Sequence, residues 1–264
     1  MKWISANRWK AIKKVLLLLM WTGMISCVVF VLAFTHKQES SLPCKKVYVA
    51  VYPIDIHFYN RQRVLETMRK GLRSDQKLLG MELDEIQVSR LEQELLKQPL
   101  LEDAEVYADM HGVLNVRVEQ RRPILRVMRF DGTQYYLDQY GVKIPLSENF
   151  TCRVPLASGN IFERFEKGDS VYSFVGNQLF KMASYVDKHP FYKALIEQIF
   201  VRADNELVLV PKVGSKYIIF GNADEPDKKF RKLLVFYREG LNRIGWNKYR
   251  SIDIRFDGQV ICKK

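Results

Sequence analysis

The sequence has little of what a catalytic or metal-binding site usually requires. Its four histidines and four cysteines form no CxxC, HxxxH or HExxH pattern, and this excludes a zinc ribbon and a thioredoxin-type redox site on spacing alone. The patterns of serine hydrolases, P-loop proteins and dinucleotide-binding folds (GxSxG, GxxxxGK(S/T) and GxGxxG) are also missing. We therefore expect no catalytic residue, no metal site, no cofactor and no small-molecule substrate.

The cysteines are too few and too scattered to indicate a disulfide framework. Cys27 lies inside an apolar run, while Cys44, Cys152 and Cys262 are far apart and odd in number. One disulfide among the last three is compatible with the sequence, but the spacing does not select a pair.

The chain has fewer acidic than basic residues. The chain has 42 Lys and Arg against 30 Asp and Glu, a net charge of +12. Five of the basic residues precede Val15, and no acidic residue lies among them. The remaining excess, about +7 (12 less 5), suits an anionic membrane face or acidic envelope polymers. It is too mild for us to expect nucleic acid as a partner.

Charge is absent altogether from Val15–Phe34. At about 1.5 Å of rise per residue, a helix of this length spans roughly the 30 Å hydrocarbon core of a bilayer. The basic residues before it keep the N-terminus in the cytoplasm and direct the rest of the chain across the membrane. The sequence thus predicts a cytoplasmic tail at residues 1–14, a transmembrane helix at 15–34 and a linker at 35–44.

Three other interpretations of the apolar run are less well supported. A cleaved signal peptide would have a shorter apolar region and a small-x-small site after it, whereas Thr35-His36-Lys37-Gln38 follows here. Met24-Ile25-Ser26-Cys27 loosely resembles a lipoprotein cleavage box, but seven more apolar residues follow Cys27. A buried helix of a soluble domain would normally show a polar face.

Residues 45–120 follow the order β-α-α-β-β. Lys46–Tyr52 alternates like a strand, and a helix capped by Asn60 follows it. Ser89 and Glu92 have the spacing of a capping box at the start of a second helix. Residues 104–110 and 113–119 then alternate on either side of a His111-Gly112 turn. This order predicts a compact domain with helices on one side of a small sheet.

Residues 121–264 are predicted to form a mixed, β-rich domain with flanking helices. Short strands are expected first, and a helix follows at Val171–Val186. Three further strands precede a helix at Phe230–Leu241. The chain closes with a hairpin, in which the strands Ser251–Phe256 and Gln259–Cys262 flank Asp257-Gly258. The predicted fold class is therefore α+β, with a single-pass membrane helix in front of two domains.

Particular segments resemble a known family. LEQELLKQPLLEDAEVY and GVLNVRVEQRRPILRV are similar to the second helix and closing strand of the polypeptide-transport-associated (POTRA) module. The segments EQRRPILRV, GTQYYLDQYGVKIPL and YRSIDIRFDGQVI resemble the FtsQ family of bacterial cell-division proteins, also called DivIB. The sequence departs from the family pattern at Leu125 or Arg126, where a small residue is common, and at Phe256, where tyrosine is common.

The resemblance implies a scaffold with a role in septum formation, and not an enzyme. Members of the family bind the division proteins FtsB and FtsL in the periplasm, and they help to recruit and regulate the septal peptidoglycan synthase complex. The protein would then lie in the cell inner membrane, enriched at the division septum, with its C-terminal domains in the periplasm. Two alternatives are a POTRA protein of outer-membrane insertion or secretion and a membrane-anchored envelope enzyme with an unrecognised site. The first would need a long run of alternating strands after the module.

A chain that ends in a β-strand leaves a sheet edge that a partner strand can extend. We place this partner-binding edge strand at the C-terminus, with Phe256 as an apolar anchor and Arg255 and Asp253 as charged selectors. The alternative is that it is simply the last strand of the fold. The expected contact residues are Ser251, Ile252, Asp253, Ile254, Arg255, Phe256, Gly258 and Val260.

The most concentrated basic stretch lies where the two predicted domains join. It is a possible contact patch for acidic lipid head groups or partner carboxylates. The alternative is a solvated strand face with salt bridges to Glu102, Glu105 and Glu119. The patch consists of Arg117, Arg121, Arg122, Arg126 and Arg129.

Overall fold

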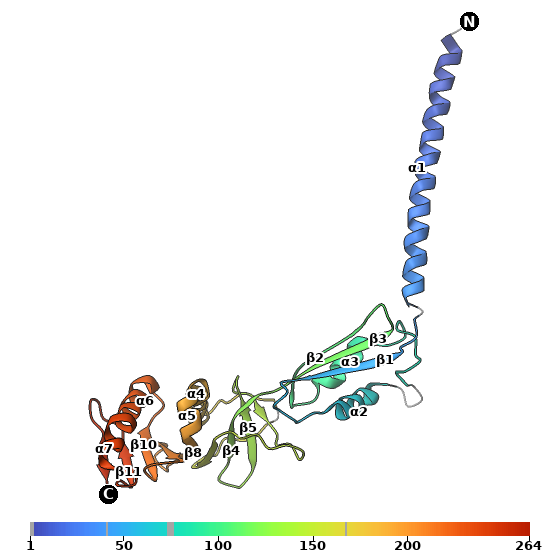
Figure 1. Cartoon of the computed structure of the whole chain (residues 1–264). Helices are drawn as coiled ribbons and strands as arrows, with labels where there is room; N and C mark the ends of the chain where they lie inside the picture. The colour runs from blue at the N-terminus through green and yellow to red at the C-terminus, as the bar shows by residue number, and fades with distance from the viewer. Residues whose placement is uncertain (1–2, 41, 73–76, 167) are drawn as a thin grey trace. The chain divides into compact units, whose positions relative to one another are not determined.

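The chain begins with one long helix. The structure is a computed structural model that describes residues 3–40, 42–72, 77–166 and 168–264. Helix α1 covers Trp3–Ser40 (Figure 1). Its window Leu16–Ala33 has a mean hydropathy of 2.5 and buries none of its surface, and it is the one helix in the described ranges that is long and apolar enough to cross a membrane.

The helix extends beyond the predicted membrane span on both sides. It includes the predicted tail from residue 3 onward and residues 35–40 of the predicted linker. The parts of those predictions that fall on residues 1–2 and 41 lie outside the described residues. Polar and basic residues at both ends therefore continue the helical backbone of the apolar run.

The contacts divide the chain into two compact units. The first unit comprises Met1–Ala50, Arg61–Leu95 and Ala104–Arg117, and the second comprises Val51–Asn60, Leu96–Asp103 and Val118–Lys264. The predicted α+β class is confirmed, since a β-α-α-β-β order is followed by a β-rich region that carries helices.

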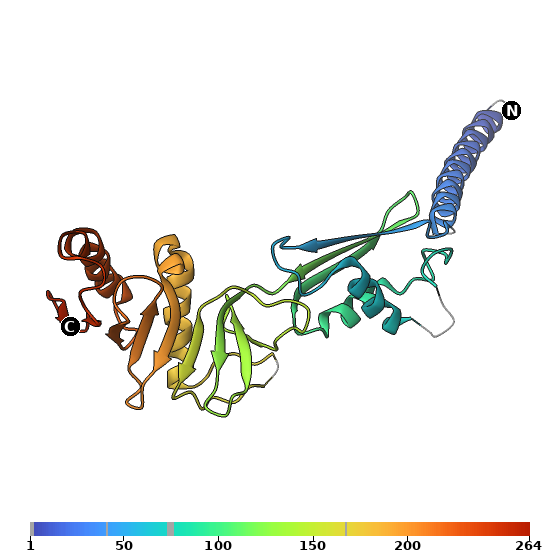
Figure 2. The same ribbon diagram turned by 60° about the horizontal axis from the view of Figure 1, so that its bottom comes forward.

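The β-α-α-β-β region forms a three-stranded sheet in the order β1-β3-β2. Helices α2 and α3 lie on one side of these strands (Figures 1 and 2). The buried face of β3 carries Leu114, Val116 and Val118, as its alternation predicts. The elements are β1 (Lys46–Tyr52), α2 (Arg61–Gly71), α3 (Val88–Leu96), β2 (Leu101–Ala108) and β3 (Val113–Gln120).

The turn between β2 and β3 confirms the predicted hairpin. The Asp109 carboxylate accepts hydrogen bonds from the amides of His111 and Val113, both at 2.9 Å. These bonds hold the pKa of Asp109 below its ordinary value, the Val113 amide having the largest effect. Gly112 takes a φ of +84°, which only glycine adopts without strain.

The predicted capping box is wrong. Helix α3 begins at Val88, so Ser89 lies inside its first turn and not at its N-cap. The carboxylate of Glu92 instead accepts a hydrogen bond from the Val106 amide of β2 at 2.8 Å. Glu92 thus links the helix to the sheet. The spacing of Ser89 and Glu92 does not predict this contact, because Val106 lies 14 residues further along the chain.

The second region contains a nine-stranded mixed sheet. Its strand order is β12-β11-β10-β9-β8-β7-β4-β5-β6, with parallel pairs β4/β7, β7/β8 and β10/β11. The strands are β4 (Pro123–Met128), β5 (Gln134–Asp138), β6 (Lys143–Ile144), β7 (Leu156–Gly159), β8 (Ile196–Val201), β9 (Leu207–Pro211), β10 (Tyr217–Gly221), β11 (Ser251–Asp253) and β12 (Ile261–Lys263).

Strand β7 is absent from the sequence predictions, although it joins the two halves of the sheet. Its sequence LASG contains no β-branched or aromatic residue, so local propensity does not reveal it. Position 159 has no room for a side chain, because a Cβ there would lie 2.2 Å from the carbonyl oxygen of Val201 on β8. The glycine is therefore explained by the close approach of the two backbones and not by strand propensity.

Helices cover the core of the nine-stranded sheet. Tyr185 of α4 stacks on Phe230 of α6 with ring centroids 4.8 Å apart, so the two helices are neighbours. Both helices begin at residues other than the predicted Val171 and Phe230. Ser173 caps α4 by accepting a hydrogen bond from the Gly176 amide at 2.9 Å, and Pro226 is the first residue of α6. The helices are α4 (Phe174–Lys188), α5 (Pro190–Leu195), α6 (Pro226–Val235), the π-helix η1 (Phe236–Leu241) and α7 (Asn242–Ile244).

All four cysteines are free thiols in the structure. The disulfide that the sequence allowed among Cys44, Cys152 and Cys262 is therefore not formed. Burial raises the pKa of the Cys152 thiol to about 11, so this thiol is protonated and weakly reactive at neutral pH.

Candidate interaction surface

The two C-terminal strands pair antiparallel as predicted, but they are shorter than the predicted strands 251–256 and 259–262: each has three residues, Ser251–Asp253 and Ile261–Lys263. The edge of the sheet also lies one strand further on. Strand β11 pairs in parallel with β10, where Ile218 opposes Ile252, and antiparallel with β12, where Ile252 opposes Cys262. Both sides of β11 are therefore occupied, and β12 ends the sheet. The assignment of the edge to the strand that begins at Ser251 is wrong, because the chain turns back after Asp257-Gly258 and its last residues cover that strand.

Burial separates the eight expected contact residues into two groups. Ser251, Ile252, Asp253 and Ile254 are buried, and the two isoleucines belong to the hydrophobic core. Arg255 and Val260 are half-buried, whereas Phe256 and Gly258 are exposed. The first part of the hairpin therefore supports the fold, and the surface begins at Arg255.

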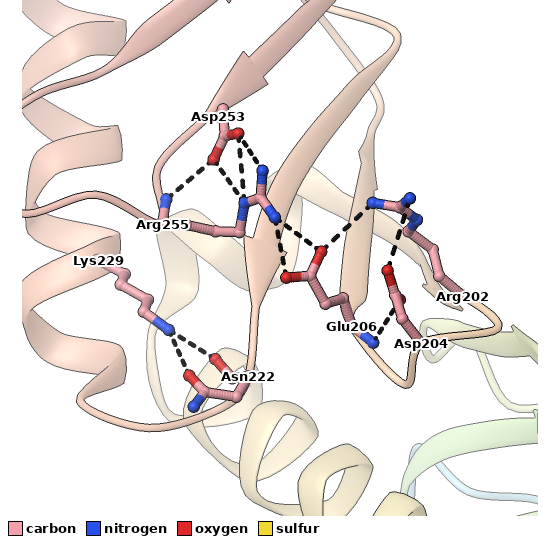
Figure 3. Close-up of polar contacts among 7 residues, drawn as sticks. All are labelled: Arg202, Asp204, Glu206, Asn222, Lys229, Asp253 and Arg255. Atoms are coloured by element: carbon pink, nitrogen blue, oxygen red, sulfur yellow. Dashed lines mark hydrogen bonds and ion pairs between the residues drawn. The ribbon is translucent and has the colours of Figure 1, made fainter.

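Arg255 joins the hairpin to the turn between β8 and β9 (Figure 3). Its Nη2 lies 2.7 Å from Asp253 Oδ2, and its Nη1 lies 2.9 Å from both carboxylate oxygens of Glu206. Glu206 also receives Arg202 Nη1 at 3.3 Å, and Arg202 Nη2 lies 3.6 Å from Asp204. The five side chains form one ion-pair network, which links the turn between β8 and β9 to the end of β11.

Asp253 and Arg255, which the sequence suggested as charged selectors of a partner, are paired within this network. Burial alone would raise the pKa of Asp253, but the hydrogen bonds from Arg255 outweigh burial and lower it below the ordinary 3.8. The hydrogen bonds that Arg255 donates to Asp253 and Glu206 in turn raise the pKa of Arg255. Asp253 and Arg255 thus neutralise each other within the chain.

Phe256 has an exposed aromatic ring on a backbone that is fixed by hydrogen bonds. It is 44% exposed, and the Arg255 guanidinium carbon lies 5.5 Å from its ring centroid. Lys232 of α6 donates to the carbonyl oxygens of Ile254, at 3.0 Å, and of Phe256. A second α6 lysine, Lys229, bonds the Asn222 carbonyl and side chain (Figure 3). The backbone at Phe256 is therefore fixed, which lowers the entropy cost of using its ring as an anchor.

Strand β12 carries surface residues that the sequence prediction left out. Ile261 is 40% exposed, Cys262 is half-buried and Lys263 is exposed. The alternation of QVIC indicated a strand, but nothing local showed that it is the outermost one. Burial raises the pKa of the Cys262 thiol.

Four of the five arginines of the predicted basic patch have partners inside the second unit. Arg121 lies 2.8 Å from the buried Asp138, and Arg122 forms a bidentate pair with Asp187 at 2.7 and 3.1 Å. Arg126 donates to Gln134 at 2.8 Å, and Arg129 pairs with Asp131. The ion-pair partners of Arg121, Arg122 and Arg129 are thus aspartates of this unit, whereas the sequence suggested Glu102, Glu105 and Glu119. Arg117 belongs to the first unit.

In the described part of the chain, no three His, Cys, Asp or Glu side chains gather as metal ligands. The geometry offers surfaces for association: an exposed ring on a fixed backbone and a three-residue strand at the end of a sheet.

Comparison with known proteins supplies the family. A family model described as FtsQ/DivIB, C-terminal related matches residues 122–263. A second model, described as a POTRA-like domain, matches residues 43–119. A search of curated proteins gave no match.

Proposed function

Because the chain belongs to the FtsQ/DivIB, C-terminal related family, we propose that it is a single-pass scaffold of the bacterial division complex. The family is one of non-catalytic scaffolds, and the POTRA-like region and the apolar helix α1 fit such a role. In this proposal the N-terminus lies in the cytoplasm, because five basic residues precede the apolar run. The chain that follows α1 then lies in the periplasm, and the protein gathers at the septum.

The proposed task is to bind FtsB- and FtsL-type partners and so to recruit and regulate septal peptidoglycan synthesis. The observation that carries this proposal is the position of β12 at the end of the nine-stranded sheet. A partner strand can add to such an edge through main-chain hydrogen bonds, while side-chain contacts give specificity. We assign the docking strand to Ile261–Lys263, with Phe256 and Ile261 as apolar anchors.

The membrane anchor strengthens such an association. Partners that are tethered to the same membrane meet the docking strand in a thin layer, so their effective concentration is raised. A strand of three residues makes few main-chain bonds, and this tethering offsets its short length. The mode of docking is therefore suited to proteins that share one membrane.

The test is co-purification of the full chain with purified periplasmic segments of FtsB- and FtsL-type proteins. Phe256→Glu, Ile261→Glu and a truncation after Gly258 should each reduce the amount of partner retained. Phe174→Glu is the matched control, since Phe174 is 65% exposed on α4 of the same unit. Near-UV circular dichroism checks that each variant is folded. Full retention by all three hairpin variants would overturn the docking site.

A cellular test addresses the function itself. Depletion of the protein should give filaments with unfinished septa, because synthase recruitment would fail. Normal division after depletion would overturn the scaffold proposal even if the partner segments bind in vitro.

A further inference from the structure

A pocket of about 560 Å³ lies in the first unit and is lined by residues of β1, of α2 and of the segments next to them. This volume is in the range of roughly 300–1,000 Å³ that small-molecule sites occupy. Ten residues line it, five cationic and five apolar. They are Lys45, Lys46, Val47, Arg61, Leu65, Arg69, Leu72, Lys77, Leu78 and Leu79.

The cations form an exposed rim. Lys45, Lys46, Arg69 and Lys77 are exposed, and none of them has a carboxylate partner among the described residues. Arg61 is fixed across the rim by a hydrogen bond from its Nη2 to the Val47 carbonyl at 3.2 Å. No Asp or Glu is among the described lining residues. Concentrated positive charge of this kind attracts an anion, and the described lining residues supply no carboxylate to compensate it.

The floor of the pocket is apolar. Val47 and Leu78 are buried, Leu65 and Leu72 are half-buried, and Leu79 keeps 62% of its surface exposed. A simple inorganic anion would use the rim and leave this floor unused. The combination fits an amphiphile with a negatively charged head and a hydrocarbon chain.

Covalent connection limits how far the pocket can lie from the membrane. Lys45 follows Ser40, the last residue of α1, by five residues, and an extended chain covers at most about 3.6 Å per residue. The seven residues from Ala33 to Ser40 add roughly 10 Å of helix. The pocket rim therefore stays within about 30 Å of the end of the apolar window, so the tether keeps the pocket close to the bilayer and allows it to contact the lipids there.

We propose that this pocket binds the phosphate head group and the adjoining acyl segment of an anionic phospholipid from the membrane that holds α1. Arg61 and Arg69 present the planar donors that match a phosphodiester, while the lysines add point charges. The five apolar side chains contact the lipid chain. The inference uses the membrane anchorage of the proposed function but none of its division partners.

Native mass spectrometry of the full chain in detergent provides the test, with phosphatidylglycerol and phosphatidylcholine as probes. Phosphatidylglycerol should bind preferentially, and Arg69→Gln/Lys77→Gln should weaken its binding roughly tenfold or more, since each basic residue near a lipid head group contributes about 1 kcal/mol. Arg153→Gln/Lys248→Gln is the matched control, because both residues are exposed in the second unit. The basic N-terminal tail is identical in all variants, so any difference reports the pocket.

A second arm separates head-group from chain recognition. Leu79→Ser should weaken phosphatidylglycerol binding and leave binding of glycerol phosphate unchanged. Three results would overturn the proposal: equal binding of the two lipids, equal effects of the pocket and control variants, or tighter binding of a polyglutamate peptide, which would indicate an acidic protein segment as the occupant. Failure here with intact partner co-purification would refute the lipid site alone.

Discussion

Arg255 on the C-terminal hairpin contacts both carboxylate oxygens of Glu206 at 2.9 Å, and so ties the last part of the chain to the start of β9. Asp253, whose side chain is only 12% exposed, shares the same guanidinium. The hairpin next to the proposed docking strand is therefore positioned by an ion-pair network as well as by its strand pairing.

Arg255→Ala should destabilise the second unit by about 1–3 kcal/mol, because it leaves two carboxylates close together without their shared cation. Urea unfolding of the full chain in mild detergent, followed by near-UV circular dichroism, measures the effect. Arg243→Ala is the control: its ion pair with Glu239 is 81% and 69% exposed and should contribute less than about 0.5 kcal/mol. Equal effects of the two substitutions would show that the network does not stabilise the hairpin.

Asp253 should make the stability of this unit depend on pH in the acid range. Because its pKa in the folded state is lowered from 3.8, the folded state keeps the carboxylate ionised at a pH where the unfolded chain binds a proton. Its contribution is complete above the unfolded pKa and is lost as pH falls through the lower folded pKa. The difference in unfolding free energy between the native chain and Asp253→Asn should therefore shrink between about pH 5 and pH 2. A pH-independent difference for Asp253→Asn would contradict the prediction.

Gly176 on α4 has no room for a side chain. A Cβ at this position would lie 1.9 Å from Glu163 Oε2, a carboxylate that is buried and bonded to the Tyr172 and Ser173 amides. Gly176→Ala should therefore cost about 1–3 kcal/mol, although alanine is the better helix former. Thermal unfolding gives the measurement, with the exposed Lys181→Ala on the same helix as the control. A stabilised Gly176→Ala variant would mean that Glu163 moves aside without loss.

Lys143 and Glu163 form a fully buried ion pair with Nζ and Oε1 2.8 Å apart. The Lys143 ammonium also donates to the Arg164 carbonyl at 3.0 Å and lies 4.3 Å from the Tyr172 ring centroid. Lys143→Met should cost about 3–5 kcal/mol, because it leaves a buried carboxylate without its cation. Adding Glu163→Gln should recover part of that loss, since glutamine is neutral and its one carbonyl oxygen can still accept from one of the two amides.

A double-mutant cycle on this pair gives the coupling energy, and the exposed Lys181–Asp224 pair, at 53% and 57% exposure, is the matched comparison. The buried cycle should show a coupling several times larger than the exposed one. Additive effects at Lys143 and Glu163 would contradict the buried ion pair.

Patterns confined to a few neighbouring residues were sufficient for much of the fold. The strand Lys46–Tyr52 has the predicted limits, and the hairpin at His111-Gly112 forms as expected. These elements follow from alternation and turn chemistry, which act over a few residues. The apolar helix follows in the same way from length and hydropathy.

The candidate site depended on neighbours that are distant in sequence. The sequence contains a C-terminal hairpin, but only the pairing of Ile252 with both Ile218 and Cys262 shows which strand ends the sheet. Likewise, the partner of Arg255 lies 49 residues away at Glu206, so no local pattern distinguishes a surface selector from a residue of an internal network.

Periodicity, turn residues and charge counted along the chain were enough to predict the membrane-length helix, the excess of basic residues before it, the β-α-α-β-β order and the turn at Asp257-Gly258. They did not show that β7 joins the two halves of the sheet, that β12 and not β11 is the outer strand, or that five cations surround one apolar pocket beside α2, all of which depend on tertiary packing. Strand neighbours and pocket walls come from segments far apart in the chain. Their identity is fixed by packing, which local propensity does not record.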